Sequence, residues 1–176
     1  GDNDFVQLAH RLDRDTSGCI IIAKSMAALR SIQAQINKLT VVKEYLALVA
    51  GNWNPANTRV DMPLLKITKS GERMMVVDEA GKPAVSHFKV VDNFEMATLV
   101  SVRLETGRTH QIRAHTAYSG HAIAGDSRYG AKEFNIAIKK LGLKRMFLHA
   151  RNIRFTHPDT GKILDIHCNL PESLRA

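Results

Sequence analysis

The sequence is poor in cysteine and has no long hydrophobic run. Its 176 residues include two cysteines, Cys19 and Cys168, which lie far apart and form no CxxC pair. This argues against a disulfide framework, and we expect both to be small apolar residues in strands. No apolar stretch approaches the roughly 20 residues that a membrane helix needs, and no signal peptide opens the chain. These absences predict a soluble, cytoplasmic protein with no membrane partner.

The sequence is also short of acidic residues. Asp and Glu number 17 against 25 Lys and Arg, which gives a formal net charge of +8. Such an excess attracts polyanions and gains free energy from counterion release. Between positions 132 and 154 only Glu133 is acidic, and the basic residues there are Lys132, Lys139, Lys140, Lys144, Arg145, Arg151 and Arg154. A solvated basic face and an RNA-binding surface explain this pattern equally well, so charge alone does not decide the function.

No internal repeat, low-complexity tract or linker divides the chain, and its length suits one domain. Ser25 is a typical N-cap and opens a predicted helix to about Leu39. The apolar stripe of this helix is Ala28, Leu29, Ile32, Ile36 and Leu39. Further helices are expected over 109–118 and 132–141. Strands are expected over 19–24, 41–50, 60–65, 74–77, 84–91, 96–104, 147–156 and 162–167. The pattern predicts an α+β fold with a mixed, mainly antiparallel sheet and flanking helices.

The first motif that suggests chemistry is HRLDRDTSG, at residues 10–18. Five of its nine residues are ionisable, and it precedes a predicted buried strand. Loops held by a rigid sheet are where catalytic residues concentrate. A loop held together by its own Arg–Asp ion pairs is the alternative interpretation. Asp13 and Asp15 are the two carboxylates that this loop offers.

Two further segments carry candidate residues. In TGRTHQIRAH, at residues 106–115, Arg113 lies one helical turn beyond Thr109 and is able to point back toward the Asp loop. His110 and His115 are five residues apart, about 500° around a helix, so they do not share a face and a zinc site is rejected. In KEYLALVAG, at residues 43–51, Tyr45 lies on one side of a strand with alternate residues, where a packing role is the usual one.

Taken together, these three segments resemble the RluA family of pseudouridine synthases. The resemblance implies that Asp13 is the catalytic nucleophile and that Arg11 enters the RNA stack where the target uridine leaves it. It implies that Tyr45 packs against the flipped base and that Arg113 pairs with the nucleophilic aspartate. The fold that it implies is the family's catalytic fold, with a central RNA-binding cleft. We expect Arg108 and His110 to contact the RNA as well.

The resemblance continues through residues 120–130, 148–150 and 155–162. Residues 64–77 and 81–88 are most similar to the RluC subtype, which modifies large-subunit ribosomal RNA. The implied substrate is therefore 23S ribosomal RNA, alone or in the assembling large subunit.

Full-length relatives carry an amino-terminal S4-like RNA-binding domain and an early strand with a Lys-Pro pair, and this sequence shows neither. We therefore expect residues 1–176 to be a catalytic domain without its first strands. The parent enzyme is expected to be monomeric, and this shorter chain to self-associate or to be poorly active. A non-catalytic RNA-binding fragment is the alternative. A glycoside hydrolase that uses Asp13 and Asp15 is disfavoured, because residues i and i+2 of a loop are poorly placed to flank a bond.

The chemistry of pseudouridine formation suits these residues. The reaction breaks the N1–C1′ bond and rejoins the uracil through C5, so as an isomerisation it needs no cofactor or metal. It needs a carboxylate that attacks C1′ or C6 or assists loss of the base, and Asp13 suits that role. Arg113 would favour the charged carboxylate, and Tyr45 would offer a stacking face worth roughly 1–3 kcal/mol. Asp15 is expected to be structural, hydrogen-bonding loop N–H groups.

Overall fold

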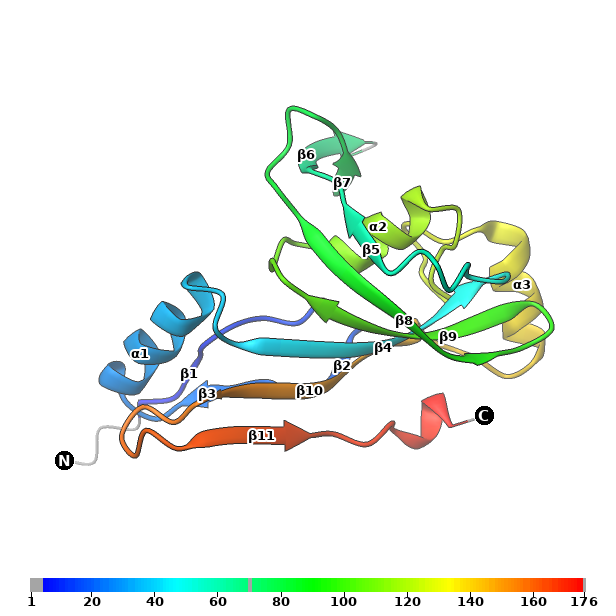
Figure 1. Ribbon diagram of the computed structural model, residues 1–176. Helices are drawn as coiled ribbons and strands as arrows, with labels where there is room; N and C mark the ends of the chain where they lie inside the picture. The colour runs from blue at the N-terminus through cyan, green and yellow to red at the C-terminus, as the bar shows by residue number, and fades with distance from the viewer. Residues whose placement is uncertain (1–4, 70, 176) are drawn as a thin grey trace.

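A computed structural model describes residues 5–69 and 71–175. The main sheet is antiparallel along its path, in the order β11 (Ile163–His167), β10 (Leu148–Thr156), β4 (Val42–Ala50), β9 (Ala97–Leu104), β8 (Val85–Asn93) and β5 (Arg59–Asp61). β2 (Ser17–Gly18) joins its edge in parallel with β10. The predicted mixed, mainly antiparallel sheet is therefore confirmed (Figure 1).

Two separate ribbons and the helices complete the fold. The ribbons are β1 (Gln7–Leu8) with β3 (Ile22–Ala23), and β6 (Leu64–Lys69) with β7 (Glu72–Val77). The helices are α1 (Met26–Asn37), α2 (Gln111–Tyr118), α3 (Lys132–Lys140) and the short η1 (Glu172–Leu174). The β6–β7 ribbon stands above the sheet in Figure 1, and α1 lies at the end away from α3. No described helix combines the length and hydropathy needed to cross a membrane.

The central core lies on the face of the sheet that α2 covers. Successive strand residues point to opposite faces, so Tyr45, Ala47 and Val49 of β4 share this face and are buried. Val102 of β9 and Ile112 of α2 pack in the same cluster. Full burial of such a side chain stabilises by roughly 1.5–3 kcal/mol. This packing fixes α2 against β4, and so fixes the two elements that carry Arg113 and Tyr45.

Smaller clusters hold the two ends of the molecule. Ile138 of α3 packs with Phe147 and Leu174. At the other end, Leu29 and Ile32 of α1 are buried in a separate cluster that also includes residues of β3 and β10. The Ser25 hydroxyl accepts a hydrogen bond from the Ala28 N–H at 3.1 Å, so the predicted N-cap is confirmed.

The predicted buried strand over residues 19–24 is wrong. Gly18 has a φ of +114°, and a Cβ there would collide with the carbonyl of Ala150. The Cys19 N–H still donates to the Ala150 carbonyl of β10 at 2.9 Å, and beyond it only a short strand, β3, follows. Ile20 and Ile22 are exposed as a result. In the sequence, this apolar run indicates a buried strand. In the structure, the close approach of Gly18 to β10 ends the strand early.

Several other boundaries differ from prediction, and three of these differences have a clear cause. The expected strand over 60–65 divides into β5 and β6, because Pro63 has no N–H to donate to a ladder and the chain leaves the main sheet there. Leu39 lies beyond the end of α1 with a φ of +59° and is exposed, so it does not belong to the apolar stripe. α2 begins at Gln111 because His110 has a left-handed φ of +52°.

Candidate active site

A cavity of about 380 Å³ lies where several parts of the chain meet. Its wall is formed by the loop of residues 9–16, by α1, by β4 and by residues 107–113, and Leu104 of β9 and Leu148 of β10 also line it. The six residues singled out from the sequence all line it: Arg11, Asp13, Tyr45, Arg108, His110 and Arg113. The fold therefore brings together side chains that are up to 102 positions apart in the sequence.

The Asp13 loop is held to the sheet behind it. A turn closes after Asp13, where the Thr16 N–H donates to the Asp13 carbonyl at 3.0 Å. The hydroxyl of Ser17 in β2 lies 2.9 Å from Nδ1 of the buried His149 in β10. Before the turn, Nε2 of His10 accepts the Ile21 N–H at 3.1 Å. These contacts fix the loop, and the Asp13 side chain is only 15 % exposed.

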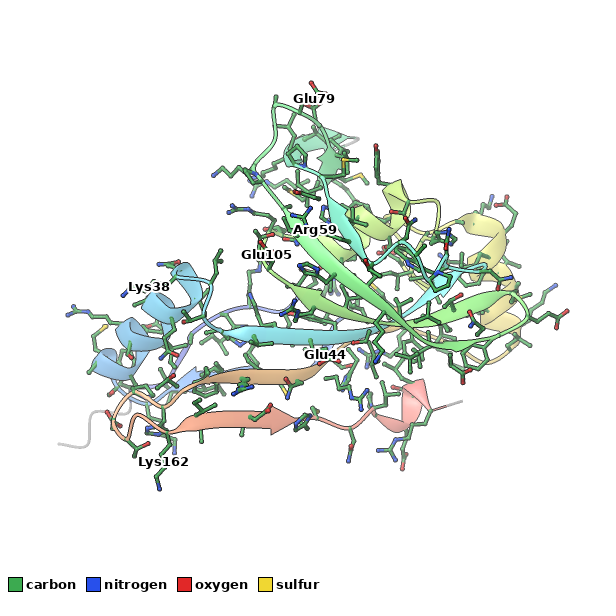
Figure 2. All side chains as sticks on the ribbon, viewed as in Figure 1. Lys38, Glu44, Arg59, Glu79, Glu105 and Lys162 are labelled. Carbon is green, nitrogen blue, oxygen red and sulfur yellow. The ribbon has the colours of Figure 1, made fainter. Side chains whose placement is uncertain are left out.

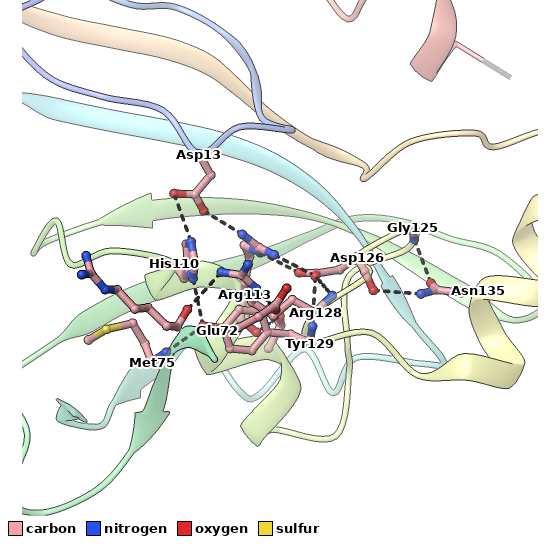
Figure 3. Close-up of polar contacts among 12 residues, drawn as sticks. Asp13, Glu72, Met75, His110, Arg113, Gly125, Asp126, Arg128, Tyr129 and Asn135 are labelled. Atoms are coloured by element: carbon pink, nitrogen blue, oxygen red, sulfur yellow. Dashed lines mark hydrogen bonds and ion pairs between the residues drawn. The ribbon is translucent and has the colours of Figure 1, made fainter. Parts of the chain in front are cut away.

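Arg113 joins two carboxylates, as Figure 3 shows. Its Nη1 lies 3.3 Å from Asp13 Oδ2, so the predicted pairing with Asp13 is confirmed. Its Nε and Nη2 donate to the two oxygens of Asp126 at 2.7 and 2.9 Å, a bidentate pair. Burial alone would lower the pKa of Arg113, but Asp126 and then Asp13 raise it. Sequence reasoning missed Asp126, which is the stronger partner.

The loop of residues 125–130 is built to present Asp126. The Oδ1 atom of Asp126 accepts the N–H groups of Arg128 and Tyr129 at 2.9 and 3.0 Å. Burial would raise the pKa of Asp126, but the Arg113 hydrogen bonds and these N–H groups lower it below its usual range. Gly125 has a φ of +74°, and a Cβ there would collide with the Arg145 carbonyl. The signal in the sequence is that Asp126 directly follows Gly125, a position where the backbone conformation requires glycine.

His110 and Tyr129 close the wall beside Asp13. The Met75 N–H donates to Tyr129 Oη at 2.8 Å, which leaves the hydroxyl proton free to bond His110 Nδ1 at 2.9 Å. His110 Nε2 then faces Asp13 Oδ1 at 3.9 Å. Burial lowers the pKa of His110 despite the opposing charge of Asp13, so the ring is neutral at pH 7. The Arg113 guanidinium also lies 4.9 Å from the centroid of the Tyr129 ring.

Two further groups on the wall have unused hydrogen-bonding capacity. Tyr45 is 9 % exposed, and burial followed by the charge of Asp13 raises its pKa to about 12. Its hydroxyl therefore stays protonated at neutral pH. Thr16 Oγ1 is buried and has no hydrogen-bond partner among the described residues. Of the two, the Tyr45 hydroxyl is the one offered to a ligand in the cavity, because the Thr16 oxygen is buried.

The predicted RNA-contact arginines lie on the rim. Arg11 and Arg108 are exposed, and Arg108 Nε donates to the Pro83 carbonyl at 3.0 Å. Arg11 also lines a second cavity of about 270 Å³ beside the β6–β7 ribbon, which is lined by Lys66, Arg73 and Arg128 as well. Arg11 therefore stands on a wall that the two cavities share. The basic residues between 132 and 154 line neither cavity.

Asp15 does not play the part expected of it. It is exposed, and among the described residues its carboxylate accepts no hydrogen bond from the loop. Its backbone carbonyl instead accepts Arg145 Nη2 at 2.9 Å. The expected hydrogen bonds to loop N–H groups are wrong, because the Thr16 N–H is already taken by the Asp13 carbonyl. Of the two carboxylates, only Asp13 lines the cavity.

Comparison with known proteins gives matches over most of the chain. A family model described as RNA pseudouridylate synthase matches residues 1–118. The chain is 50% identical over 175 residues to the ribosomal large subunit pseudouridine synthase C of Pasteurella multocida (strain Pm70), which covers 99% of this chain and 54% of that protein. The corresponding protein of Escherichia coli (strain K12) is 48% identical over 174 residues, with 97% and 54% covered. The chain therefore spans about half the length of these relatives.

Solved structures show the same fold. Human RNA pseudouridylate synthase domain containing 1 has a TM-score of 0.77 and 27% identity, over 97% of this chain and 72% of that chain. Human RNA pseudouridylate synthase domain containing 4 has the same TM-score at 24% identity, over 97% and 73%. The second likeness bears on the fold alone, and together they confirm the predicted fold class.

Proposed function

Because the chain belongs to the RNA pseudouridylate synthase family, we propose that it isomerises uridine to pseudouridine in large-subunit ribosomal RNA. The observation that carries this proposal is Asp13, a carboxylate on the cavity wall that is paired with Arg113 at 3.3 Å. The relatives are named for the ribosomal large subunit, which indicates the substrate class. Free 23S RNA and the assembling subunit both fit, and either substrate would place the protein in the cytoplasm.

Asp13 would supply the carboxylate that starts the reaction. Attack at the sugar C1′, attack at uracil C6 and assistance to departure of the base all begin from this group. Arg113 pairs with this carboxylate at 3.3 Å and restricts its direction. The N1–C1′ bond breaks, a C5–C1′ bond forms, and the proton on C5 is replaced by one on N1. The atoms of the nucleotide balance without an added reagent.

The target uridine must leave its stack to reach Asp13, at a cost of a few kcal/mol. The cavity falls in the size range of small-molecule sites, roughly 300–1,000 Å³. Tyr45 would stack on the uracil, and its protonated hydroxyl would donate a hydrogen bond. Arg11, on the wall between the two cavities, would fill the vacated place in the RNA. The basic second cavity would receive the phosphates of neighbouring nucleotides, and Arg108 and His110 would add contacts at the rim and wall.

A tritium-release assay tests the proposal. Large-subunit ribosomal RNA transcribed with 5-tritiated uridine would be incubated with the protein, and its nucleosides then separated. Tritium in the solvent together with pseudouridine in the RNA is the expected result. RNA binding without tritium release would indicate a binding module instead, and free uracil would indicate a hydrolase. Mapping of pseudouridines in ribosomal RNA from cells with and without the gene would then give the target.

A further inference from the structure

Lys43 is a cation on the cavity wall. The roles proposed for Asp13, Arg113 and Tyr45 leave it without a function in the reaction. We propose that Lys43 forms a binding site for a phosphate of the nucleotide held over Asp13. The proposal deepens the proposed function and rests on it.

The placement follows from the register of β4. Lys43 and Tyr45 are alternate residues of one strand, so they share a face, and both line the cavity. Glu44 between them belongs to the other face, where its Oε1 accepts the Ser101 hydroxyl at 2.6 Å (Figure 2). A Cβ on Gly107 would lie 2.9 Å from Lys43 Nζ. The ammonium therefore rests against the backbone of the same segment that carries Arg108 and His110.

Within residues 5–69 and 71–175, the Lys43 ammonium has no anionic partner. Lys43 is partly buried, and burial lowers its pKa. Among the described residues, no carboxylate lies within 4.0 Å of it, whereas Arg113 has two such partners. Burial lowers the pKa of the His10 ring, and the charge of Lys43 adds a smaller effect in the same direction. A half-buried cation without a partner is destabilising in the free protein, and a ligand that brings a negative charge would remove that cost.

Phosphate is the ligand group that fits. The formal charges of an RNA strand are on its phosphates, and an ammonium binds phosphate well as a point charge. Lys43 and Tyr45 are separated by about 7 Å along the strand. Stacking of the uracil on Tyr45 would thus leave the sugar and its phosphate to extend toward Lys43. The other role open to Lys43 is to stabilise negative charge on the uracil when the N1–C1′ bond breaks.

A cycle of protein and RNA changes separates these roles. The protein change is Lys43→Gln, with Lys89→Gln as the matched control, because Lys89 is exposed on β8 and lines neither cavity. The RNA change is a neutral methylphosphonate placed 5′ or 3′ of the target uridine in a short synthetic substrate. Dissociation constants and single-turnover rates would be measured for each pair at several salt concentrations.

If Lys43 binds phosphate, Lys43→Gln weakens binding of the ordinary RNA by about tenfold or more. One methylphosphonate weakens wild-type binding by a similar factor, and the two changes together cause no further loss. The slope of log affinity against log salt falls by about 0.7, and Lys89→Gln changes none of these results by that much. The free Lys43→Gln protein is at least as stable as wild type, because an unpartnered cation has been removed.

Other results would overturn the phosphate site. If Lys43→Gln and the methylphosphonate each reduce RNA affinity and the two reductions add, Lys43 contacts neither phosphate. A slower single-turnover rate with unchanged affinity would assign Lys43 to the departing uracil. A fall in the thermal stability of free Lys43→Gln would indicate a structural role. Wild-type protein that binds the RNA without isomerising it would contradict the proposed function instead, and the affinity cycle would still decide the phosphate site.

Discussion

Two parts of the cavity wall differ in whether the protein supplies an anionic partner for a cation. At the carboxylate cluster, which we define as Asp13, Arg113 and Asp126, the protein supplies every partner of the cation at 2.7 to 3.3 Å. At Lys43, the protein supplies no anion among the described residues. The first arrangement holds a reactive group in place before a ligand arrives. The second leaves a charge for the ligand to satisfy. The reactive carboxylate is thus positioned before the RNA binds, whereas the charge of Lys43 gains its partner only from the RNA.

The largest effect should come from removing the reactive carboxylate. We expect Asp13→Asn to abolish isomerisation while RNA affinity stays near wild type, because the amide keeps the shape but cannot act as a nucleophile. Asp15→Asn is the matched control and should retain activity, since Asp15 is exposed and lies off the cavity. Tritium release and filter binding measure the two properties. If Asp15→Asn were the inactive variant, the assignment of the nucleophile would be wrong.

A somewhat smaller effect is expected when Asp13 is kept but loses its cation. Arg113→Met should slow isomerisation on the order of 10²-fold, since a carboxylate misplaced by about 1 Å has that effect. Arg108→Met should chiefly weaken RNA binding, because among the residues that the structure describes its exposed guanidinium bonds only the Pro83 carbonyl. Single-turnover rates at saturating protein separate the two effects. Equal rate losses would indicate that both arginines serve general phosphate binding.

The Arg113 variant needs a control for folding. Without Arg113, Asp126 is left buried without its cation. Among the described residues it keeps only the N–H groups of Arg128 and Tyr129. Loss of one partner of a buried ion pair destabilises by roughly 3–5 kcal/mol. Arg113→Lys retains a cation and should fold better, although a lysine cannot reproduce the bidentate contact to Asp126. Circular dichroism melts would identify which variant is folded under assay conditions, and rates would be compared only for folded proteins.

The smallest effect expected is on stability in acid. His115 is fully buried, with Nε2 donating to the Met62 carbonyl at 3.0 Å and Nδ1 facing the Ser86 hydroxyl at 3.0 Å. Burial lowers its pKa below 6.5. Because the unfolded chain binds a proton more readily, the stability from neutral His115 is present above pH 6.5 and is lost as pH falls through the folded-state pKa.

Denaturant unfolding at several pH values between 7.5 and 5 would measure this loss. His115→Gln should flatten the pH dependence, since glutamine can hydrogen-bond without titrating. His167→Gln changes an exposed histidine of β11 and should leave the dependence unchanged. If the free energy of unfolding of His115→Gln falls with decreasing pH as steeply as that of wild type, other groups cause the acid instability.

Sequence motifs predicted the site residues that lie within them, but not the residues whose contacts depend on how the chain packs. Asp13, Tyr45 and Arg113 were predicted, and they meet at one cavity. Asp126 was missed because its contact with Arg113 depends on how the 125–130 loop folds back, which no spacing reveals. Lys43 was missed because a lysine at the start of a strand is usually solvated, and only the fold shows it turned inward beside Gly107.

The errors in the fold have a similar cause. The main sheet and its antiparallel pairing followed from alternation and turn residues, which are local signals. The apolar run after Gly18 looked like a buried strand, but its course depends on the close contact with Ala150, 132 positions away. Long-range contacts of this kind decide which apolar runs are buried.

A double-mutant cycle on Asp126 and Arg113 tests the carboxylate cluster most directly. If Asp126 acts only by positioning Arg113 against Asp13, the effects of Asp126→Asn and Arg113→Lys on the single-turnover rate overlap. We predict that the double variant is no slower than the slower single variant, with both singles folded and RNA saturating. Losses that multiply in the double variant would show that the two residues act independently, and would contradict a cluster that works as one unit to aim Asp13.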